Sequence, residues 1–229
     1  MKRSLPFAII MLALFAALGS GFYFSRPVRN TDAAAAAPSR NPPPPSALPT
    51  TGAEPAHVRG AEKTAVTLEE FADFECPACG GFYPILKAIE KDYGSRIQVI
   101  FREFPLGQHV HALPAARAAE AAGLQGKFWE MHDLLYENRD SWTKAPDVQV
   151  VFLEYARRLG LDVERFKKDQ TSELVQKRIT LDHVRGRHMK LRSTPTVYLN
   201  GVEIPFAEMK TTEALRKTIE QALATKPQS

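Results

Sequence analysis

The sequence predicts an α/β domain in which an all-helical insertion separates a β-α-β unit from a β-β-α unit. Strand-like and helix-like segments alternate at both ends of residues 61–229, whereas residues 108–190 show only helical periodicity. The only two cysteines of the chain, Cys76 and Cys79, lie where the first strand meets the first helix. An Asn-Gly pair near the C-terminus marks a tight hairpin between two later strands.

The N-terminal unit is predicted as strand, helix and strand. Residues 66–74 are predicted as a strand that runs into the cysteine motif, and the following helix is expected to end at Gly94. A second strand is expected at 97–104, where apolar residues are alternating or continuous, as in a buried strand. A helix that connects two neighbouring strands makes them parallel, with a right-handed crossover.

The insertion at 108–190 is predicted from apolar residues at helical spacing. Residues 114–122 have the composition of a strong helix former, and Gly123 follows as a stop. Two further helices each gather apolar side chains on one face, namely Phe128, Met131, His132 and Leu135, and then Val148, Val151, Phe152, Tyr155 and Leu159. We interpret these positions as core, and His132 as a packing residue.

Strand structure returns at residues 196–199. Asn200-Gly201 predicts a two-residue type I′ turn, which needs a positive φ at both positions. The chain then pairs back over 202–205, and 211–225 is predicted as a closing helix. The complete order of elements is that of a thioredoxin fold interrupted by an inserted all-helical cap.

The first 60 residues are expected to lie outside this domain. A mostly apolar run over 5–24 is long enough to span a bilayer, and basic residues flank it, so residues 1–25 are predicted as a membrane anchor or a signal segment. Residues 26–60 are rich in Pro and Ala, cannot build a core, and are predicted as an extended linker. The mild net charge of +4, without a basic stripe, gives no indication of nucleic-acid binding.

The Cys-Pro-Ala-Cys motif at a strand-to-helix turn favours redox chemistry. Unpaired N–H groups and the helix dipole stabilise a negative charge on the first sulfur, and the thiolate is the reactive form. Two other readings stay open. A zinc site would need His109 and His111 beside the two cysteines, and a structural disulfide closing so small a loop would add little stability. We expect no metal and no other cofactor.

Several segments resemble the DsbA-type thiol–disulfide oxidoreductases, specifically the Gram-positive-like branch with an extended helical insertion. The likeness covers roughly residues 62–225 and implies a thioredoxin fold and an enzyme of thiol–disulfide exchange. The segments that carry it are 71–79 (FADFECPAC), 101–106 (FREFPL), 126–133 (GKFWEMHD), 159–162 (LGLD) and 193–196 (STPT).

The resemblance implies roles for four residues around the motif. Cys76 corresponds to the exposed nucleophile and Cys79 to the buried resolving thiol. Pro195 matches the cis-proline that faces the dithiol in this fold. Thr194 would then present backbone groups to a substrate strand, as in β-augmentation.

Three further positions bear on the chemistry. Glu70 resembles the buried acid beneath the dithiol that could shuttle the proton of Cys79; the alternative is an exposed strand glutamate, with Glu69 facing the opposite way. Pro84 resembles the helix-kinking proline of thioredoxins. Ala78 stands where the strongest oxidants of the family carry histidine, so a cation that would stabilise the thiolate is missing.

The sequence therefore predicts an exported thiol–disulfide oxidoreductase that oxidises protein thiols. Its expected partners are unfolded or reduced exported proteins and a membrane redox partner that recycles the dithiol. The expected location is the bacterial cell envelope or periplasm, with an N-terminal anchor in the inner membrane, because disulfides persist in oxidising compartments. Two alternatives remain: a disulfide reductase or isomerase fed by a membrane electron carrier, and a non-catalytic thiol- or metal-binding interaction module.

Overall fold

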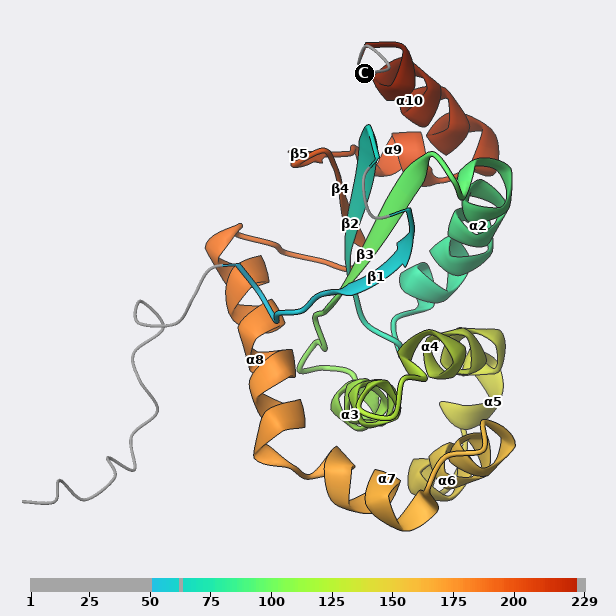
Figure 1. Ribbon diagram of the computed structural model, residues 1–229, viewed down its shortest axis with the longest axis vertical. Coiled ribbons are helices and arrows are strands. Elements are labelled where there is room, and N and C mark those ends of the chain that lie inside the picture. Colours follow the sequence, from blue (N-terminus) through green and yellow to red (C-terminus); the bar gives the residue numbers. More distant parts are fainter. Residues whose placement is uncertain (1–50, 62–63, 226–229) are drawn as a thin grey trace, which may run out of the picture. The chain divides into compact units, whose positions relative to one another are not determined.

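A five-stranded sheet forms the centre of the domain. The computed structural model of the protein describes residues 51–61 and 64–225. The strand order is β1-β3-β2-β4-β5 (Figure 1), and only β2 and β3 run parallel. The strands are β1 (His57–Gly60), β2 (Val66–Ala72), β3 (Ile97–Glu103), β4 (Thr196–Leu199) and β5 (Val202–Glu203).

The helices complete the predicted order of elements. Helix α2 (Pro77–Tyr93) connects the parallel strands, which confirms the β-α-β unit. The C-terminal unit adds α9 (Phe206–Met209) and α10 (Thr212–Thr225) after the β4–β5 hairpin. The insertion is helical, as predicted, and consists of α3 (Ala112–Gly123), α4 (Phe128–Glu137), α5 (Arg139–Trp142), α6 (Val148–Arg158), α7 (Val163–Gln170) and α8 (Glu173–His188).

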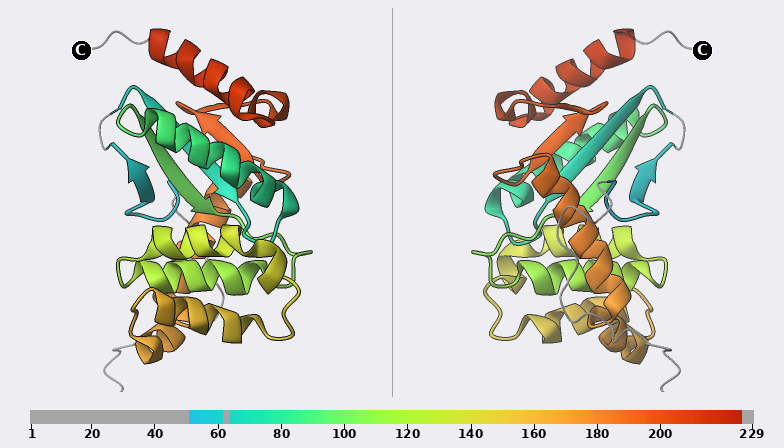
Figure 2. Two further views of the ribbon diagram at one scale, coloured as in Figure 1. Left: turned by 90° about the vertical axis from the view of Figure 1, so that its right-hand side faces the viewer. Right: turned by 90° about the vertical axis from the view of Figure 1, so that its left-hand side faces the viewer.

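The two faces of the sheet pack against different helices, because side chains alternate along a strand. Leu68 and Val99 belong to a buried cluster that includes side chains of α2 and α10. Phe71 belongs to a cluster on the opposite face, where α8 packs against β3. The two opposite views of Figure 2 show this arrangement, with α2 in front of the sheet in one and α8 in the other.

The β4–β5 hairpin has the predicted turn. Asn200 and Gly201 have φ values of 50° and 84°, both in the left-handed region that a type I′ turn requires. The Asn200 side chain also accepts a hydrogen bond from the backbone N–H of Thr67 at 2.9 Å and donates to the carbonyl of Ala65 at 3.1 Å. The turn residue therefore also fixes β4 beside the start of β2.

The folded domain begins earlier than residue 61, where the sequence places the end of the linker. Strand β1 pairs antiparallel with β3, and His57 lies opposite Phe101. Four residues are too short for a periodic signal, and this strand depends on a β3 edge far away in the sequence. The predicted membrane segment, residues 1–25, lies outside the described residues; within those that are described, no helix has both the length and the apolar character to cross a bilayer.

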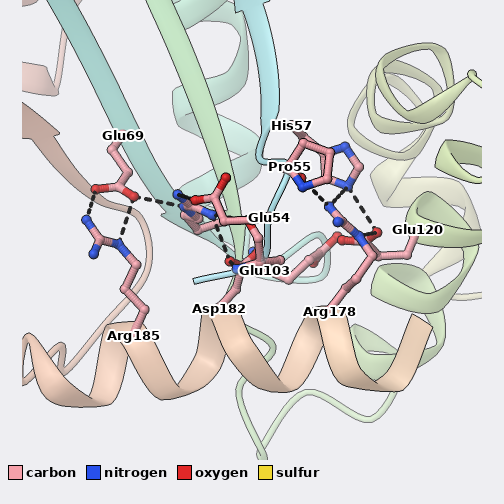
Figure 3. A network of polar contacts seen from close by, with 11 residues as sticks. Glu54, Pro55, His57, Glu69, Glu103, Glu120, Arg178, Asp182 and Arg185 are labelled. Atoms are coloured by element: carbon pink, nitrogen blue, oxygen red, sulfur yellow. Dashed lines mark hydrogen bonds and ion pairs between the residues drawn. The ribbon is translucent and has the colours of Figure 1, made fainter. Parts of the chain in front are cut away.

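A polar network fixes the segment before β1 on α8 (Figure 3). The backbone N–H of Ala53 donates to Asp182 at 2.7 Å, and the carbonyl of Pro55 accepts from Arg178 at 3.1 Å. His57 Nε2 lies 3.0 Å from a carboxylate oxygen of Glu120, to which Arg178 also donates. Residues 53–57, which the sequence predicts to be linker, are therefore part of the packed structure.

Helix α8 can approach β3 closely because residue 186 is a glycine. A Cβ at Gly186 would lie 2.5 Å from the Phe104 ring, which is itself buried. Gly81 in α2 is the matched contrast, since a Cβ there would meet nothing within 4 Å.

We expect Gly186→Ala to lower the free energy of unfolding by about 1–3 kcal/mol through overpacking. Gly81→Ala is the control, and it should be neutral or raise stability by up to about 1 kcal/mol, because alanine favours helix. Urea unfolding of both variants measures the difference. Equal effects of the two substitutions would contradict the close approach at Gly186.

Candidate active site

The cysteine motif lies at the end of β2, where the chain turns into α2. Cys76 is the N-cap residue of α2, and Pro77 follows at the start of the helix, where its missing N–H costs no hydrogen bond. The turn before it is closed by Asp73, whose carbonyl accepts from the N–H of Cys76 at 3.1 Å and whose carboxylate accepts from the N–H of Glu75 at 2.8 Å. This local geometry directs the first sulfur to the N-terminal end of α2.

The two sulfurs have unequal surroundings. Both cysteines are free thiols; Cys79 is fully buried, and Cys76 retains 6% of its surface. Cys76 is thus less exposed than the resemblance implies. Its Sγ lies 3.4 Å from the carbonyl oxygen of Thr194, and the Thr194–Pro195 peptide bond is cis, as the resemblance implies. The structure brings these four residues together, although 118 positions separate Cys76 from Thr194.

The environment lowers the pKa of Cys76 from 9.0 to about 5. The main cause is a hydrogen bond from the Cys79 thiol, and the backbone N–H groups of Cys79 and Ala78 add to it, while burial opposes the shift. The pKa of Cys79 is raised well above its usual value by burial and by the neighbouring Cys76. At neutral pH the thiolate therefore resides on Cys76.

Glu70 and Glu69 point to opposite faces of the sheet, as alternation along β2 requires. Glu70 is buried, and burial together with the charge of Glu90 raises its pKa to about 8. Its charge contributes to the raised pKa of Cys79. Burial alone would raise the pKa of Glu69 too, but hydrogen bonds from Arg185 and Arg102 outweigh it and lower that pKa. Glu70 is therefore the acid on the dithiol side.

Side chains that the sequence did not single out hold the motif turn. The buried Asp73 carboxylate accepts from the backbone N–H of Leu106 at 2.9 Å and contacts His109 Nδ1 at 2.7 Å. The Glu75 carboxylate accepts from the N–H of His111 at 2.5 Å. An Asp directly after a strand is a known turn former and could have been recognised.

The two histidines that a zinc site would need, His109 and His111, contact the acidic residues of the motif turn. His109 contacts Asp73 through its ring, and His111 binds Glu75 through its backbone. Throughout residues 51–61 and 64–225, no three His, Cys, Asp or Glu side chains are grouped as metal ligands.

The helical insertion packs directly onto the motif. One buried cluster contains Cys76, Cys79 and Phe74 together with side chains of α3, α4 and α6. A cleft of about 390 Å³ opens beside the first turn of α2, and it is lined by Pro77, Gly80, Gly81, Tyr136, Glu137, Arg139 and Asp140. A larger cleft, of about 910 Å³, is lined mainly by the segment 171–181 and does not contain the dithiol.

Comparison with known proteins identifies the fold. A family model described as thioredoxin matches residues 52–221. A thioredoxin-like oxidoreductase from Silicibacter pomeroyi DSS-3 is 24% identical with a TM-score of 0.63, and the match covers 75% of this chain and 94% of that one. Oxidised BdbD from Bacillus subtilis is 24% identical with a TM-score of 0.64, over 74% and 93% of the two chains. Wolbachia pipientis alpha-DsbA1 is 19% identical with a TM-score of 0.65, over 78% and 94%. The predicted thioredoxin fold with its DsbA-like insertion is confirmed.

Curated relatives match a shorter stretch. The protein named Na(+)/H(+) antiporter NhaA 3 of Salinispora tropica is 41% identical over 146 residues, which is 63% of this chain and 22% of that protein. NhaA 1 of Salinispora arenicola is 40% identical over the same shares. The chain therefore spans about a fifth of the length of these relatives, and their names describe proteins of which only that part is matched.

We expect the stability of the reduced protein to rise relative to the oxidised protein between about pH 5 and pH 9. Within this window the Cys76 thiol of the unfolded chain binds a proton that the folded chain has lost, so the free energy of unfolding increases with pH. The slope is at most about 1.4 kcal/mol per pH unit for one proton.

The contribution of the Cys76 thiolate to the free energy of unfolding is complete above the pKa that Cys76 has in the unfolded chain. It is lost as the pH falls through about 5, the pKa of Cys76 in the folded chain. Denaturant unfolding of both redox forms across this range measures it, since groups that titrate in both forms largely cancel. A difference that does not change with pH would contradict the lowered pKa of Cys76.

Proposed function

The chain belongs to the thioredoxin family, and on that premise we propose that it is a thiol–disulfide oxidoreductase whose reacting pair is Cys76 and Cys79. The supporting observation is the asymmetry of the pair: a low-pKa thiol at a helix start beside a fully buried high-pKa thiol. Such an asymmetry gives one attacking and one resolving sulfur.

The proposed direction is oxidation of protein thiols. A substrate thiolate attacks Cys76 Sγ of the disulfide, a substrate–Cys76 bond forms, and the Cys76–Cys79 bond breaks with Cys79 leaving as a thiolate that takes up a proton. A second substrate thiolate then attacks the substrate sulfur, and Cys76 leaves as a thiolate. Two electrons pass from the substrate dithiol to the cysteine pair.

Glu70 is the proposed proton donor to Cys79. Its pKa of about 8 keeps the carboxyl largely protonated at neutral pH, so it has a proton to give when Cys79 departs as a thiolate. The buried position excludes bulk solvent as the obvious source, since both Glu70 and Cys79 are buried. When Cys79 attacks in the reverse direction, the same carboxylate would receive the proton.

Thr194 and Pro195 form the proposed substrate-binding edge. The Thr194 carbonyl already lies next to Cys76 Sγ, so an extended substrate segment pairing with this backbone would bring its own sulfur close to Cys76. A backbone-based contact of this kind suits many different protein substrates.

The proposed partners are reduced exported proteins and a membrane redox partner that accepts the two electrons. The proposed location is the bacterial cell envelope, with residues 1–25 as an inner-membrane anchor or a cleaved signal. A cytoplasmic dithiol oxidant would be held reduced by the thiol pools of that compartment. The second candidate is a reductase or isomerase fed by a membrane electron carrier, and Ala78, which adds no cation beside the thiolate, favours it.

Substituting the two cysteines separates their roles. Cys79→Ser should accumulate mixed disulfides with cellular proteins, because the resolving thiol is gone, whereas Cys76→Ser should form none. Non-reducing gels of cell extracts measure both. Equal trapping by the two variants would contradict the assignment of Cys76 as the attacking sulfur, and trapping by neither would argue for the non-catalytic module.

The equilibrium of the dithiol with glutathione distinguishes an enzyme that oxidises its substrates from one that reduces them. A reduction potential above about −200 mV would support the oxidant, and one near about −270 mV would support the reductase.

Fractionation with N-terminal sequencing tests the location. We expect the intact chain in the membrane fraction, with residues 61–229 accessible to protease added outside the cytoplasm. A soluble exported form beginning near Ser20 would identify residues 1–25 as a cleaved signal. A protected, cytoplasmic catalytic domain would contradict the proposed oxidation of exported proteins.

A further inference from the structure

The carbonyl of Glu75, the residue directly before Cys76, is bound by a cation from the helical insertion. Arg139 of α5 donates to this oxygen through Nε at 2.9 Å and also through Nη2. Its side chain is 16% exposed, so the contact is largely shielded from water. A guanidinium that donates two N–H groups to one acceptor fixes both the distance and the orientation of that acceptor.

The backbone of α5 is itself firmly held, so the guanidinium has a defined position. Trp142 is fully buried, and its Nε1–H donates to the carbonyl of Leu135 at 2.7 Å. The Thr143 hydroxyl donates to the carbonyl of Arg139 at 2.9 Å. An arginine whose backbone lacked such contacts would not be held in one position.

The first turn of α2 leaves room for the arginine. A Cβ at Gly80 would lie 2.8 Å from Arg139 Cδ, so the stem of the arginine passes where any other residue would place a side chain. Gly80, which directly follows the second cysteine, is therefore required by packing. A side chain at this position would block the path of Arg139 to Glu75.

The acidic side chains near this contact do not hold the guanidinium away from the Glu75 carbonyl. Asp140 accepts from Arg139 Nη1 at 2.9 Å, but its side chain is 86% exposed, and water screens such a pair strongly. Glu137, which also lines the cleft, accepts from Tyr83, and the Glu75 carboxylate accepts from the N–H of His111.

We propose that Arg139 is a positioning residue for Cys76: it fixes the Glu75–Cys76 peptide and supplies, from the helical insertion, the positive charge that Ala78 does not. A cation at this place favours the thiolate over the thiol and therefore makes the Cys76–Cys79 disulfide more oxidising. The inference rests on the proposed function, since it takes Cys76 as the reacting sulfur.

The test compares Arg139→Met and Arg139→Lys with the wild-type full chain. Arg157→Met is the matched control, because Arg157 lies in α6 of the same insertion and pairs only with the exposed Glu154 among the described residues. The readouts are the pH midpoint of thiolate absorbance and the equilibrium constant with glutathione. The melting temperature of the oxidised form reports whether each variant folds.

Arg139→Met should raise the thiolate midpoint by about one pH unit and shift the glutathione equilibrium about tenfold toward the disulfide form, or about 30 mV. Arg139→Lys should recover part of both shifts, because it restores the charge without the two-donor geometry. Arg157→Met should change neither. An unshifted Arg139→Met, or a lysine variant no better than methionine, would overturn the proposal; the lysine variant alone decides it if methionine prevents folding.

These outcomes also separate this inference from the proposed function. If Cys76 is not the reacting thiol, the wild-type protein itself will show no thiolate titrating well below the ordinary cysteine range. If only the role of Arg139 is mistaken, the wild type will show that low midpoint and Arg139→Met will retain it.

Discussion

The buried carboxylate of Asp73 is the contact on which the geometry of the dithiol depends. It accepts from the N–H of Glu75 within the turn and from the N–H of Leu106 after β3, and it contacts His109 before α3. Three segments of the chain therefore meet at one side chain, three residues before Cys76. Removal of the buried Asp73 carboxylate would leave the N–H groups of Glu75 and Leu106 without this acceptor, which is costly. The reacting sulfur is positioned through this shared acceptor as much as through the helix it begins.

The alternation of β2 places two adjacent glutamates in opposite electrostatic environments. Glu69 faces α8, where Arg185 donates to it at 2.8 Å and Arg102 at 2.8 Å, so it stays ionised. Glu70 faces the apolar side beneath the dithiol, where burial favours the protonated form. The same residue type thus serves as an ion-pair partner on one face and as an acid with an exchangeable proton on the other. A shift of one residue in register would exchange these two environments.

Several elements could be predicted from the sequence because their signals are local. The strand at β2, the helix α2 and the Asn200-Gly201 turn follow from apolar periodicity and turn chemistry within a few residues. The short helices α5 and α9 span four residues each, too few for a periodic pattern, and were not foreseen. The sequence predicts linker where β1 lies, because the stability of this strand comes from pairing with β3 and from the polar network on α8.

The amino-acid sequence was sufficient to predict the β-α-β unit, the helical insertion, the β-β-α unit and the place of Cys76 and Cys79 at a helix start, because these features depend on neighbouring residues. Its resemblance to a family also supplied the cis-proline Pro195. The burial of Cys76 and the residues that hold its turn follow from the packing of distant segments. Asp73 and Arg139 contact segments that lie dozens of positions away in the sequence. These contacts form only when the insertion packs onto the sheet, so no local sequence pattern predicts them.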